Sequence, residues 1–449
     1  MLDGLNGLDE FCTGALAEHG CPSVSIAVAA GGDLVLARAY GTADLGERRA
    51  ATPGTVYGLA SATKPFTALA VCLAADRGLL DLDAPVPGRF RRAAPTPRQL
   101  LQHRGGFPAF YNFHYTDGPL PGGPLPVDLD RYREQVREPD TGFEYSNLGY
   151  QELGRLLEQI TGRALGELLR EWIAEPLGLP HFAFGAVPGA SAPVATRYTP
   201  DGRAYPVCHS SHPAAGAGWA TAGELALFAR RSPTLLTPGT AAAVLDAPPI
   251  GPRLGYGLGR VVQRTADGAP ISSHGGGMGG IAAMMIDLPE RQLSVAVLAN
   301  STDKSARDAV VGHLMDALAP EFDPAHLSPV SEPDLPLALA PSRWAGHLSG
   351  PDGDVPVRLT VLTGGQVEVS LADLPPVTVP ALASHRWDVR LTAPLQLPTP
   401  DALVNSPAFA LELRAGRSAL TGRATAYKPG DRSGFLGPYL PHRCELHPA

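Results

Sequence analysis

The 449-residue sequence predicts an α/β sandwich with a central antiparallel sheet and an all-helical part, followed by a small all-β barrel or sandwich. Three observations predict this class. Strand-like and helix-like stretches follow one another along most of the chain, a proline-rich stretch then interrupts them, and short alternating segments separated by turns come last. We therefore expect a first domain over 1–322, a linker over 323–341 and an all-β domain over 342–449.

The first half of the chain predicts one hairpin and then mainly helices. The segments 23–30 and 34–41 are strand-like runs on either side of a Gly-Gly-Asp turn, a pattern that favours a hairpin. Apolar residues then recur at helical spacing from Phe66 to Leu80. Further helices are expected at 96–103, 145–161, 163–179 and 218–231, and a long loop rich in Pro, Gly and Tyr at 108–140.

The second half predicts consecutive strands. Three strands are expected at 257–264, 271–289 and 291–301, and a terminal helix at 301–320 closes the first domain. The segments beyond the linker alternate apolar and polar residues with a turn every 8 to 12 residues, which is typical of a small barrel or sandwich. The strands expected there are 355–365, 366–374, 385–393, 408–416 and 418–427.

Composition excludes several classes of function. Apolar residues make up 44 % of the chain and charged residues 18 %, as in globular proteins, and no apolar run is long enough to span a bilayer. The net charge of −8 and the absence of a basic stripe argue against a nucleic-acid partner. The five cysteines show no pattern of a disulfide framework or a zinc site, and the start of the chain shows no export signal. A cytoplasmic protein is therefore expected.

Lysine is scarce, which draws attention to each lysine that is present. Of the 36 basic residues only three are lysines, namely Lys64, Lys304 and Lys428. Arginine keeps its proton at any accessible pH, whereas a desolvated lysine can act as a base. Lys64 follows Ser61 by three residues, so both side chains share one helical face and the amine can take the proton of the hydroxyl. The alternative interpretation is a capping serine beside a surface lysine.

Two further segments carry groups suited to the same chemistry. Tyr145 and Asn147 open the helix that follows the long loop, where a phenol can move protons and an amide can hold a substrate carbonyl. The alternative there is an ordinary helix cap with a half-buried tyrosine. His274 is followed by three glycines on a predicted strand, which allows a ligand or another backbone to approach closely. The alternative is a glycine-rich turn with an incidental histidine.

The order of these motifs resembles the serine β-lactamase and penicillin-binding-protein superfamily. Ser61-x-x-Lys64, Tyr145-x-Asn147 and His274-x-Gly276 fall in the order and at the separations of that superfamily, most closely of its class C β-lactamase, D-aminopeptidase and carboxylesterase branch. The resemblance covers about residues 5–320 and implies a β-lactamase-like fold. D-Aminopeptidases of this branch also carry appended β-barrel domains, which is similar to the arrangement predicted here.

The resemblance implies roles for particular residues. Ser61 would be the acylated nucleophile, and Lys64 and Tyr145 would share the proton transfers. Asn147 would orient the substrate amide. The N–H groups of Ser61 and Gly277 would form the oxyanion hole, with His274 and Gly276 in the third motif. No metal and no other cofactor are implied.

The third motif departs from most of the superfamily. Lys-Thr-Gly is usual there, and its lysine binds the substrate carboxylate, whereas His274-Gly275-Gly276 offers neither a fixed charge nor a hydroxyl. D-Aminopeptidase-like members use His-x-Gly, so the variant favours a serine hydrolase that acts on an ester or on a peptide or amide of a D-amino acid. The loop at 108–140 and the C-terminal domain are expected to shape the pocket for this small-molecule or short-peptide substrate.

Other functions stay open at this point. One alternative is β-lactamase or DD-carboxypeptidase activity. Another is a non-catalytic member whose pocket only senses a ligand, although an intact Ser-Lys-Tyr set argues against it. The C-terminal domain could also serve as an oligomerisation module, in which case the protein forms a homo-oligomer. The substrate itself depends on loop conformations that the sequence does not encode locally.

Overall fold

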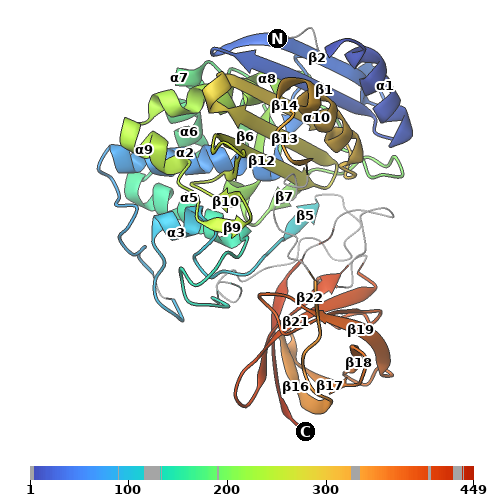
Figure 1. Cartoon of the computed structure of the whole chain (residues 1–449). Coiled ribbons are helices and arrows are strands. Elements are labelled where there is room, and N and C mark those ends of the chain that lie inside the picture. The colour runs from blue at the N-terminus through green and yellow to red at the C-terminus, as the bar shows by residue number, and fades with distance from the viewer. Residues whose placement is uncertain are drawn as a thin grey trace. The chain divides into compact units, whose positions relative to one another are not determined.

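The computed structural model describes residues 5–88, 90–115, 132, 134–189, 192–324, 334–402, 406–427, 437 and 439–449. The chain divides into two units. The first comprises residues 1–107, 133–329 and 431–434, and the second comprises residues 108–132, 330–430 and 435–449. Each unit is described by itself (Figure 1). The boundaries expected at residues 322 and 342 stay predictions.

An antiparallel sheet forms the centre of the first unit. Its strand order is β3-β2-β1-β14-β13-β12-β11-β10-β9. Strands β1, β13 and β14 are buried on both faces, whereas most residues of β2 are exposed or half-buried. The central strands are therefore nearly continuous apolar runs. The bounds are β1 Ser23–Ala30, β2 Asp33–Asp44, β3 Arg49–Ala50, β9 Pro249–Gly251, β10 Leu254–Tyr256, β11 Val261–Arg264, β12 Pro270–Met278, β13 Ile281–Leu288 and β14 Leu293–Ala299.

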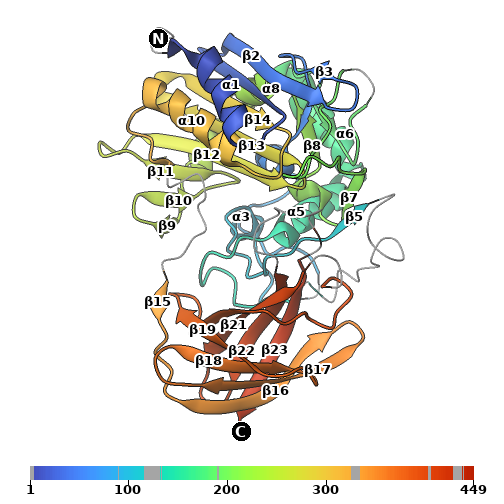
Figure 2. The same cartoon turned by 90° about the vertical axis from the view of Figure 1, so that its right-hand side faces the viewer.

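Helices cover both faces of this sheet. α1 (Leu8–Glu18) and α10 (Ser305–Leu318) lie together against one face, where their leucines and valines form a core with the apolar side chains of β1, β13 and β14 (Figure 2). α8 (Ala222–Arg231) packs on the other face and begins with a capping box between Thr221 and Glu224. The resulting sandwich of helix, sheet and helix confirms the predicted fold class.

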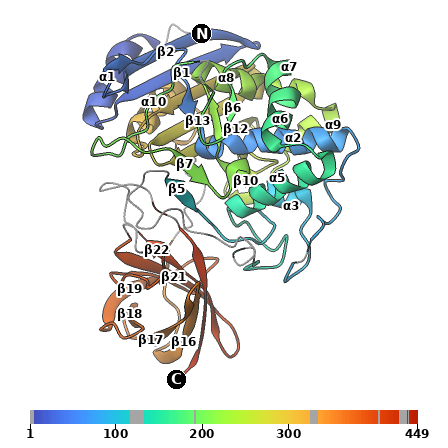
Figure 3. The same ribbon diagram turned by 180° about the vertical axis from the view of Figure 1, so that it is seen from behind.

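The all-helical part lies on the side of α8 opposite the central sheet (Figure 3). Its central helix is α2 (Lys64–Asp76), nearly all of whose residues are buried. The other helices there are α3 Pro97–Leu101, α5 Asn147–Thr161, α6 Leu165–Leu169, α7 Glu175–Leu177 and α9 Pro238–Val244, with a π-helical turn at Arg170–Ala174 and 3-10 turns at Ala60–Thr63, Pro213–Ala215, Ser232–Leu235 and Pro289–Arg291. Short strands β4 (Tyr57–Gly58), β6 (Ala183–Phe184) and β8 (Gly218–Ala220) form a small sheet, and β7 spans Cys208–Ser210.

One strand prediction was wrong. The segment 271–289, expected as a single strand, forms the two strands β12 and β13, which pair in an antiparallel hairpin. The turn between them is Gly279-Gly280, and Gly280 has φ of 69°, a left-handed conformation that glycine adopts without strain. The Gly279-Gly280 pair, which comes directly before the apolar run 281–286, therefore marked a reversal of the chain.

The second unit contains a closed barrel of eight antiparallel strands among the residues that the structure describes. Each of β16 to β22 pairs with the next strand in the chain, and β23 pairs with β16 to close the ring. The structure thus decides between the barrel and the sandwich that the sequence allowed. The bounds are β16 Ser342–Gly350, β17 Gly353–Val361, β18 Gln366–Leu371, β19 Val377–Ala383, β20 Val389–Ala393, β21 Ala408–Ala415, β22 Leu420–Tyr427 and β23 Pro441–Pro448.

Alternating apolar side chains fill the barrel interior. In β17, for example, Val357, Leu359 and Val361 are buried. Strands β16, β19 and β23 were not among the segments predicted from the sequence. Part of the expected linker, β15 (Leu335–Pro336), pairs with β19.

The long loop expected at 108–140 falls largely outside the described residues. Its first part includes the short strand β5 (Phe113–Tyr115) and groups with the barrel. Tyr111 and Tyr439 exchange backbone hydrogen bonds of 2.9 Å and 2.6 Å. Among the described residues, no helix combines the length and the apolar character needed to cross a bilayer. All five cysteines are buried and none forms a disulfide.

Candidate active site

Ser61 lies on a tight turn between β4 and α2. The 3-10 turn Ala60–Thr63 leads directly into α2, and Ala60 has φ of 46°, which is uncommon for a residue with a side chain. Thr63 accepts a hydrogen bond of 2.8 Å from the N–H of Gly218 in β8, which anchors the turn. The strained backbone sets the position of Ser61 ahead of a long buried helix.

Lys64 is the first residue of α2 and is completely buried. Its Nζ lies 2.9 Å from Ser61 Oγ, 2.8 Å from Asn147 Oδ1 and 3.1 Å from the carbonyl oxygen of Ala215. A neutral amine has two protons and one lone pair. The two protons can serve the two carbonyl oxygens, which leaves the lone pair for the Ser61 hydroxyl. The interpretation of Lys64 as a surface lysine is therefore wrong.

Burial also governs the charge of this amine. Desolvation lowers the pKa of Lys64 well below its ordinary value of 10.5, and no carboxylate in the described part of the chain opposes the shift. This shift favours the neutral form of the amine. A buried, uncharged amine in contact with a serine hydroxyl can accept its proton.

The start of α5 supplies the second group of polar atoms. Ser146 is the N-cap and accepts a hydrogen bond from the N–H of Gly149, and Asn147 reaches Lys64. Tyr145 is half-buried, and the centre of its ring lies 4.8 Å from Lys64 Nζ. The capping alternative therefore describes Ser146 correctly, while the neighbouring Asn147 and Tyr145 both face the lysine.

His103, to which the sequence assigned no site, supports this segment. The N–H of Ser146 donates to His103 Nδ1 at 3.0 Å, and the His103 ring packs against Tyr145 with centres 4.2 Å apart. Burial lowers the pKa of His103 well below 6.5. This neutral ring forms the wall behind Tyr145. The only sequence signal for this role of His103 was its position just before Gly105-Gly106.

His274 lies on β12 and is also neutral. Its Nδ1 is 2.7 Å from the carbonyl oxygen of Gly275, so this nitrogen carries the proton, and Nε2 accepts from the Tyr256 hydroxyl at 2.8 Å. Burial, followed by the influence of Lys64, lowers the pKa of His274 to about 3. The third motif thus presents a hydrogen-bonded imidazole rather than a cation. Tyr256, in β10, is a partner that sequence reasoning had not singled out.

The glycines after His274 let β12 approach the turn of Ser61. A side chain on Gly276 would collide with the carbonyl oxygen of Leu59, two residues before Ser61. A side chain on Gly277 would collide with the aliphatic end and the ammonium group of Lys304. Lys304 is exposed and precedes α10. A cation therefore lies beside Gly277 although the third motif itself carries none.

A cavity of about 200 Å³ adjoins these residues. Its lining includes Gly216, which follows the Lys64 partner Ala215 in the chain, and Met278, which follows Gly277. Gly218 and Trp219 also line it. Arg197 adds a guanidinium to the wall. Ser61, Lys64 and Tyr145 do not line this cavity, but a side chain on Gly216 would contact the backbone of Ala60, so the cavity approaches the turn that carries Ser61.

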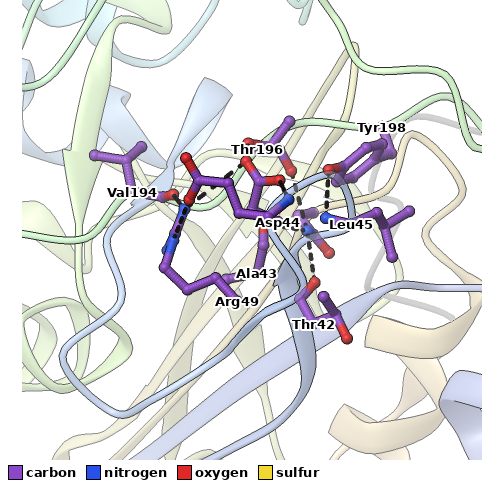
Figure 4. Close-up of polar contacts among 10 residues, drawn as sticks. Thr42, Ala43, Asp44, Leu45, Arg49, Val194, Thr196 and Tyr198 are labelled. Carbon is purple, nitrogen blue, oxygen red and sulfur yellow. Dashed lines mark hydrogen bonds and ion pairs between the residues drawn. The ribbon is translucent and has the colours of Figure 1, made fainter.

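The segment that carries Arg197 is tied to the edge of the central sheet (Figure 4). The Thr196 hydroxyl donates to Asp44 at 2.5 Å, and this bond is the largest cause that lowers the pKa of Asp44. Arg49 donates to the carbonyl oxygen of Val194 at 2.7 Å, and the Tyr198 hydroxyl accepts from the N–H of Leu45 at 2.7 Å. These bonds hold the pocket wall in place on both sides of Arg197.

The fold brings the predicted residues together from three distant segments. Ser61, Lys64 and Asn147 are joined by hydrogen bonds, Tyr145 faces Lys64, and the strand that carries Gly276 and Gly277 lies beside the turn of Ser61. His274 is turned toward Tyr256. Their catalytic roles stay predictions.

Comparison with known proteins gives one family. A family model described as Beta-lactamase matches residues 8–319. Penicillin-binding protein 4* of Bacillus subtilis (strain 168) is 24 % identical over 320 residues, which is 64 % of this chain and 70 % of that protein. D-Aminopeptidase of Brucella canis is 31 % identical over 165 residues, 35 % of this chain, and the match spans about a third (32 %) of that enzyme.

A solved structure resembles the fold along nearly the whole chain. The crystal structure of SurE with D-Leu covers 97 % of this chain and 99 % of its own, with a TM-score of 0.67 and 22 % identity. At this identity the likeness concerns the fold alone.

Proposed function

The chain belongs to the β-lactamase family, and we propose that it is a serine hydrolase in which Ser61 forms an acyl-enzyme with an ester or with a peptide or amide of a D-amino acid. The observation that carries the proposal is the buried Lys64 amine, 2.9 Å from Ser61 Oγ and with its pKa lowered by burial. A serine becomes a strong nucleophile only when a base removes its proton.

The proposed reaction follows from the contacts of this amine. Lys64 takes the proton of Ser61 as Oγ attacks the substrate carbonyl carbon, and the N–H groups of Ser61 and Gly277 bind the oxygen that becomes negative. The leaving alcohol or amine receives a proton from the Lys64 and Tyr145 pair. A water molecule then attacks the acyl-enzyme, the acid is released, and Ser61 recovers its proton.

Two observations support a substrate of the D-amino-acid class. A D-aminopeptidase is among the relatives of this chain. The third motif also lacks a charged residue, because burial, followed by the influence of Lys64, lowers the pKa of His274 to about 3. A β-lactam carboxylate would find no cation at that position.

The first test is labelling of Ser61 with a fluorophosphonate, read by intact-protein mass spectrometry. We expect one stoichiometric adduct on the wild type and none on Ser61→Ala. The same substitution should lower ester hydrolysis by at least about 10³-fold, because removal of a nucleophile leaves only binding and oxyanion effects. Retained activity in Ser61→Ala would contradict the mechanism. A folded wild type that takes no adduct and hydrolyses no ester would favour the ligand-sensing alternative.

Lys304 favours a second candidate, a carboxypeptidase that acts on peptides ending in a D-residue with a free carboxylate. The ammonium group lies beside Gly277, where the proposed oxyanion hole ends. A substrate carboxylate on the leaving-group side could form a charge-assisted hydrogen bond there. DD-carboxypeptidase activity needs such a carboxylate site, whereas hydrolysis of a neutral amide does not.

The two candidates differ in their response to Lys304→Met. If Lys304 binds a substrate carboxylate, KM for a D,D-dipeptide should rise at least about tenfold, since hydrogen bonds to charged groups contribute about 1.5–3 kcal/mol. The matching D-amino-acid amide should be unaffected, and Lys304→Arg should restore part of the loss. Equal effects on both substrates would assign Lys304 no role in specificity and leave the amidase or esterase function as the better description.

A further inference from the structure

A second cavity, of about 280 Å³, lies on another side of α2 from Ser61. Pro65 and Leu69, one helical turn apart, face it, and Ser61, Lys64, Asn147 and His274 do not line it. The remaining walls come from the end of α8, from the 3-10 turn Ser232–Leu235 and α9, from the segment before β11, and from β12, β13 and Pro289. All of these elements belong to the first unit.

α9 spans this cavity instead of packing into a core. None of its seven residues is buried, although the helix includes three alanines and a valine. Its first turn is bonded to the end of α2, because Thr237 and Thr240 both donate hydroxyl hydrogen bonds to Asp76. Near its other end the N–H of Leu258 donates to the carbonyl oxygen of Val244 at 3.2 Å. The helix is therefore held at both ends over a space with apolar walls.

One end of the cavity is positively charged. Its ionisable lining residues are Arg230, Arg260 and Asp287, so two guanidinium groups face a single carboxylate. Arg230 donates to Asp287 at 2.8 Å, which neutralises one of the two positive charges. Arg260 is only 5 % exposed and has no carboxylate within ion-pair distance among the described residues. Asp287 also attracts Arg260 at longer range, so a single carboxylate balances two buried guanidinium groups, and an anion in the cavity would balance the second positive charge.

Two buried hydroxyl groups surround Arg260. Ser232 Oγ accepts from Arg260 at 2.6 Å, and Ser272 Oγ accepts a longer bond of 3.5 Å. Each hydroxyl therefore serves the guanidinium with a lone pair and keeps its own proton to donate. Among the residues that the structure describes, neither proton has an acceptor. Two O–H donors and a guanidinium thus meet at the charged end of the cavity, whose lining residues other than these and the Arg230–Asp287 pair are apolar.

We propose that this cavity is a second ligand site, which binds a small carboxylate with an apolar tail. The carboxylate oxygens would accept from Arg260, Ser232 and Ser272, and the tail would lie along Pro65, Leu69 and the inner side of α9. An apolar cavity of about 150 Å³ accepts the six carbon atoms of benzene, so this one has room for about ten non-hydrogen atoms. Octanoate has that size.

The test is calorimetric titration of the full-length Ser61→Ala protein, which cannot turn over an ester, with octanoate, octan-1-ol and octylamine. These probes share one tail and differ in the charge of the head group. We expect saturable binding of one octanoate, affinity at least about tenfold lower for the alcohol, and no binding of the amine. No saturable binding of octanoate, or equal affinity for the alcohol, would overturn the proposal.

Variants separate this cavity from the pocket beside Ser61. Ala241→Phe, which fills the cavity from α9, should abolish octanoate binding, and the double change Ser232→Ala with Ser272→Ala should weaken it at least about tenfold. The control Ser305→Ala removes an exposed hydroxyl at the start of α10 and should change nothing. Octanoate binding that survives Ala241→Phe would place the ligand elsewhere. The two serine changes are small enough to test the head-group contacts even if the phenylalanine variant fails to fold.

Discussion

At the scale of single residues, the protonation of Lys64 decides what Ser61 can do. The amine is enclosed by Ser61 Oγ, Asn147 Oδ1 and the carbonyl oxygen of Ala215. These three oxygens would satisfy an ammonium group as well as an amine. Burial without a carboxylate partner favours the amine, because desolvation penalises the charged form. The chemistry proposed for Ser61 therefore depends on the burial of this amine as much as on the contacts themselves.

Lys64→Arg separates the charge of this residue from its basicity. Arginine keeps a cation at the position but cannot give up its proton, so proton transfer from Ser61 should fail. We expect kcat/KM for an ester to fall about 10²–10⁴-fold, the usual contribution of a general base. A stopped assay with purified variants checks this, with circular dichroism to confirm that the variant folds. Near-normal activity would mean that Lys64 acts only through its charge.

At the scale of elements, the site depends on how closely β12 approaches the turn before α2. Gly276 lies against the Leu59 carbonyl, and Gly277 lies against Lys304. Any side chain at Gly276 would push the strand away from Ser61. The glycines after His274 are therefore required by the packing of two backbones, which is the function that glycine-rich strands commonly serve.

Gly276→Ala should separate β12 from the turn of Ser61. We expect a loss of at least about 2 kcal/mol in the free energy of unfolding, since the colliding atom is backbone and cannot rotate away, together with a large loss of esterase activity. The matched control is Gly312→Ala in α10, where a new Cβ meets open space. That change should stabilise the protein by about 0.5–1 kcal/mol through helix propensity and leave activity unchanged. Equal behaviour of the two variants would contradict the close approach.

At the scale of the whole molecule, buried neutral side chains link stability to pH. The pKa of His103 lies well below 6.5 and that of His274 is about 3, in both cases mainly because of burial. The unfolded chain binds protons at these residues below about pH 6.5, whereas the folded protein does not. Stability therefore falls as the pH drops, and each histidine contributes about 1.4 kcal/mol per pH unit.

The melting temperature should accordingly fall between pH 7 and pH 5. Lys64 contributes with the same sign over a wider range, because its folded pKa is lowered too. His103→Gln removes one titrating group, so its melting temperature should depend less steeply on pH than that of the wild type. Calorimetry of both proteins at several pH values checks this. Identical slopes would mean that His103 is protonated in the folded protein.

The sequence by itself determined the class of fold and the order of the motifs. Strand and helix periods, the Ser61-Lys64 spacing and the turn glycines are encoded within a few residues, so they can be recognised locally. The same information did not show that segment 271–289 turns back on itself, because its glycines are compatible with the close approach of another backbone to one strand as well as with a turn. It also left barrel and sandwich undecided, because ring closure depends on pairing between strands about 100 residues apart.

Only the tertiary structure decided the chemical state of the site. Lys64 and Asn147 are 83 residues apart, and their 2.8 Å contact exists because α2 and α5 pack together. The complete burial of Lys64, the neutral His274, the position of Lys304 beside Gly277 and the second cavity likewise depend on which distant segments pack together. Burial and long-range distance are properties of the packed chain, and they set the pKa values on which the proposed reaction depends.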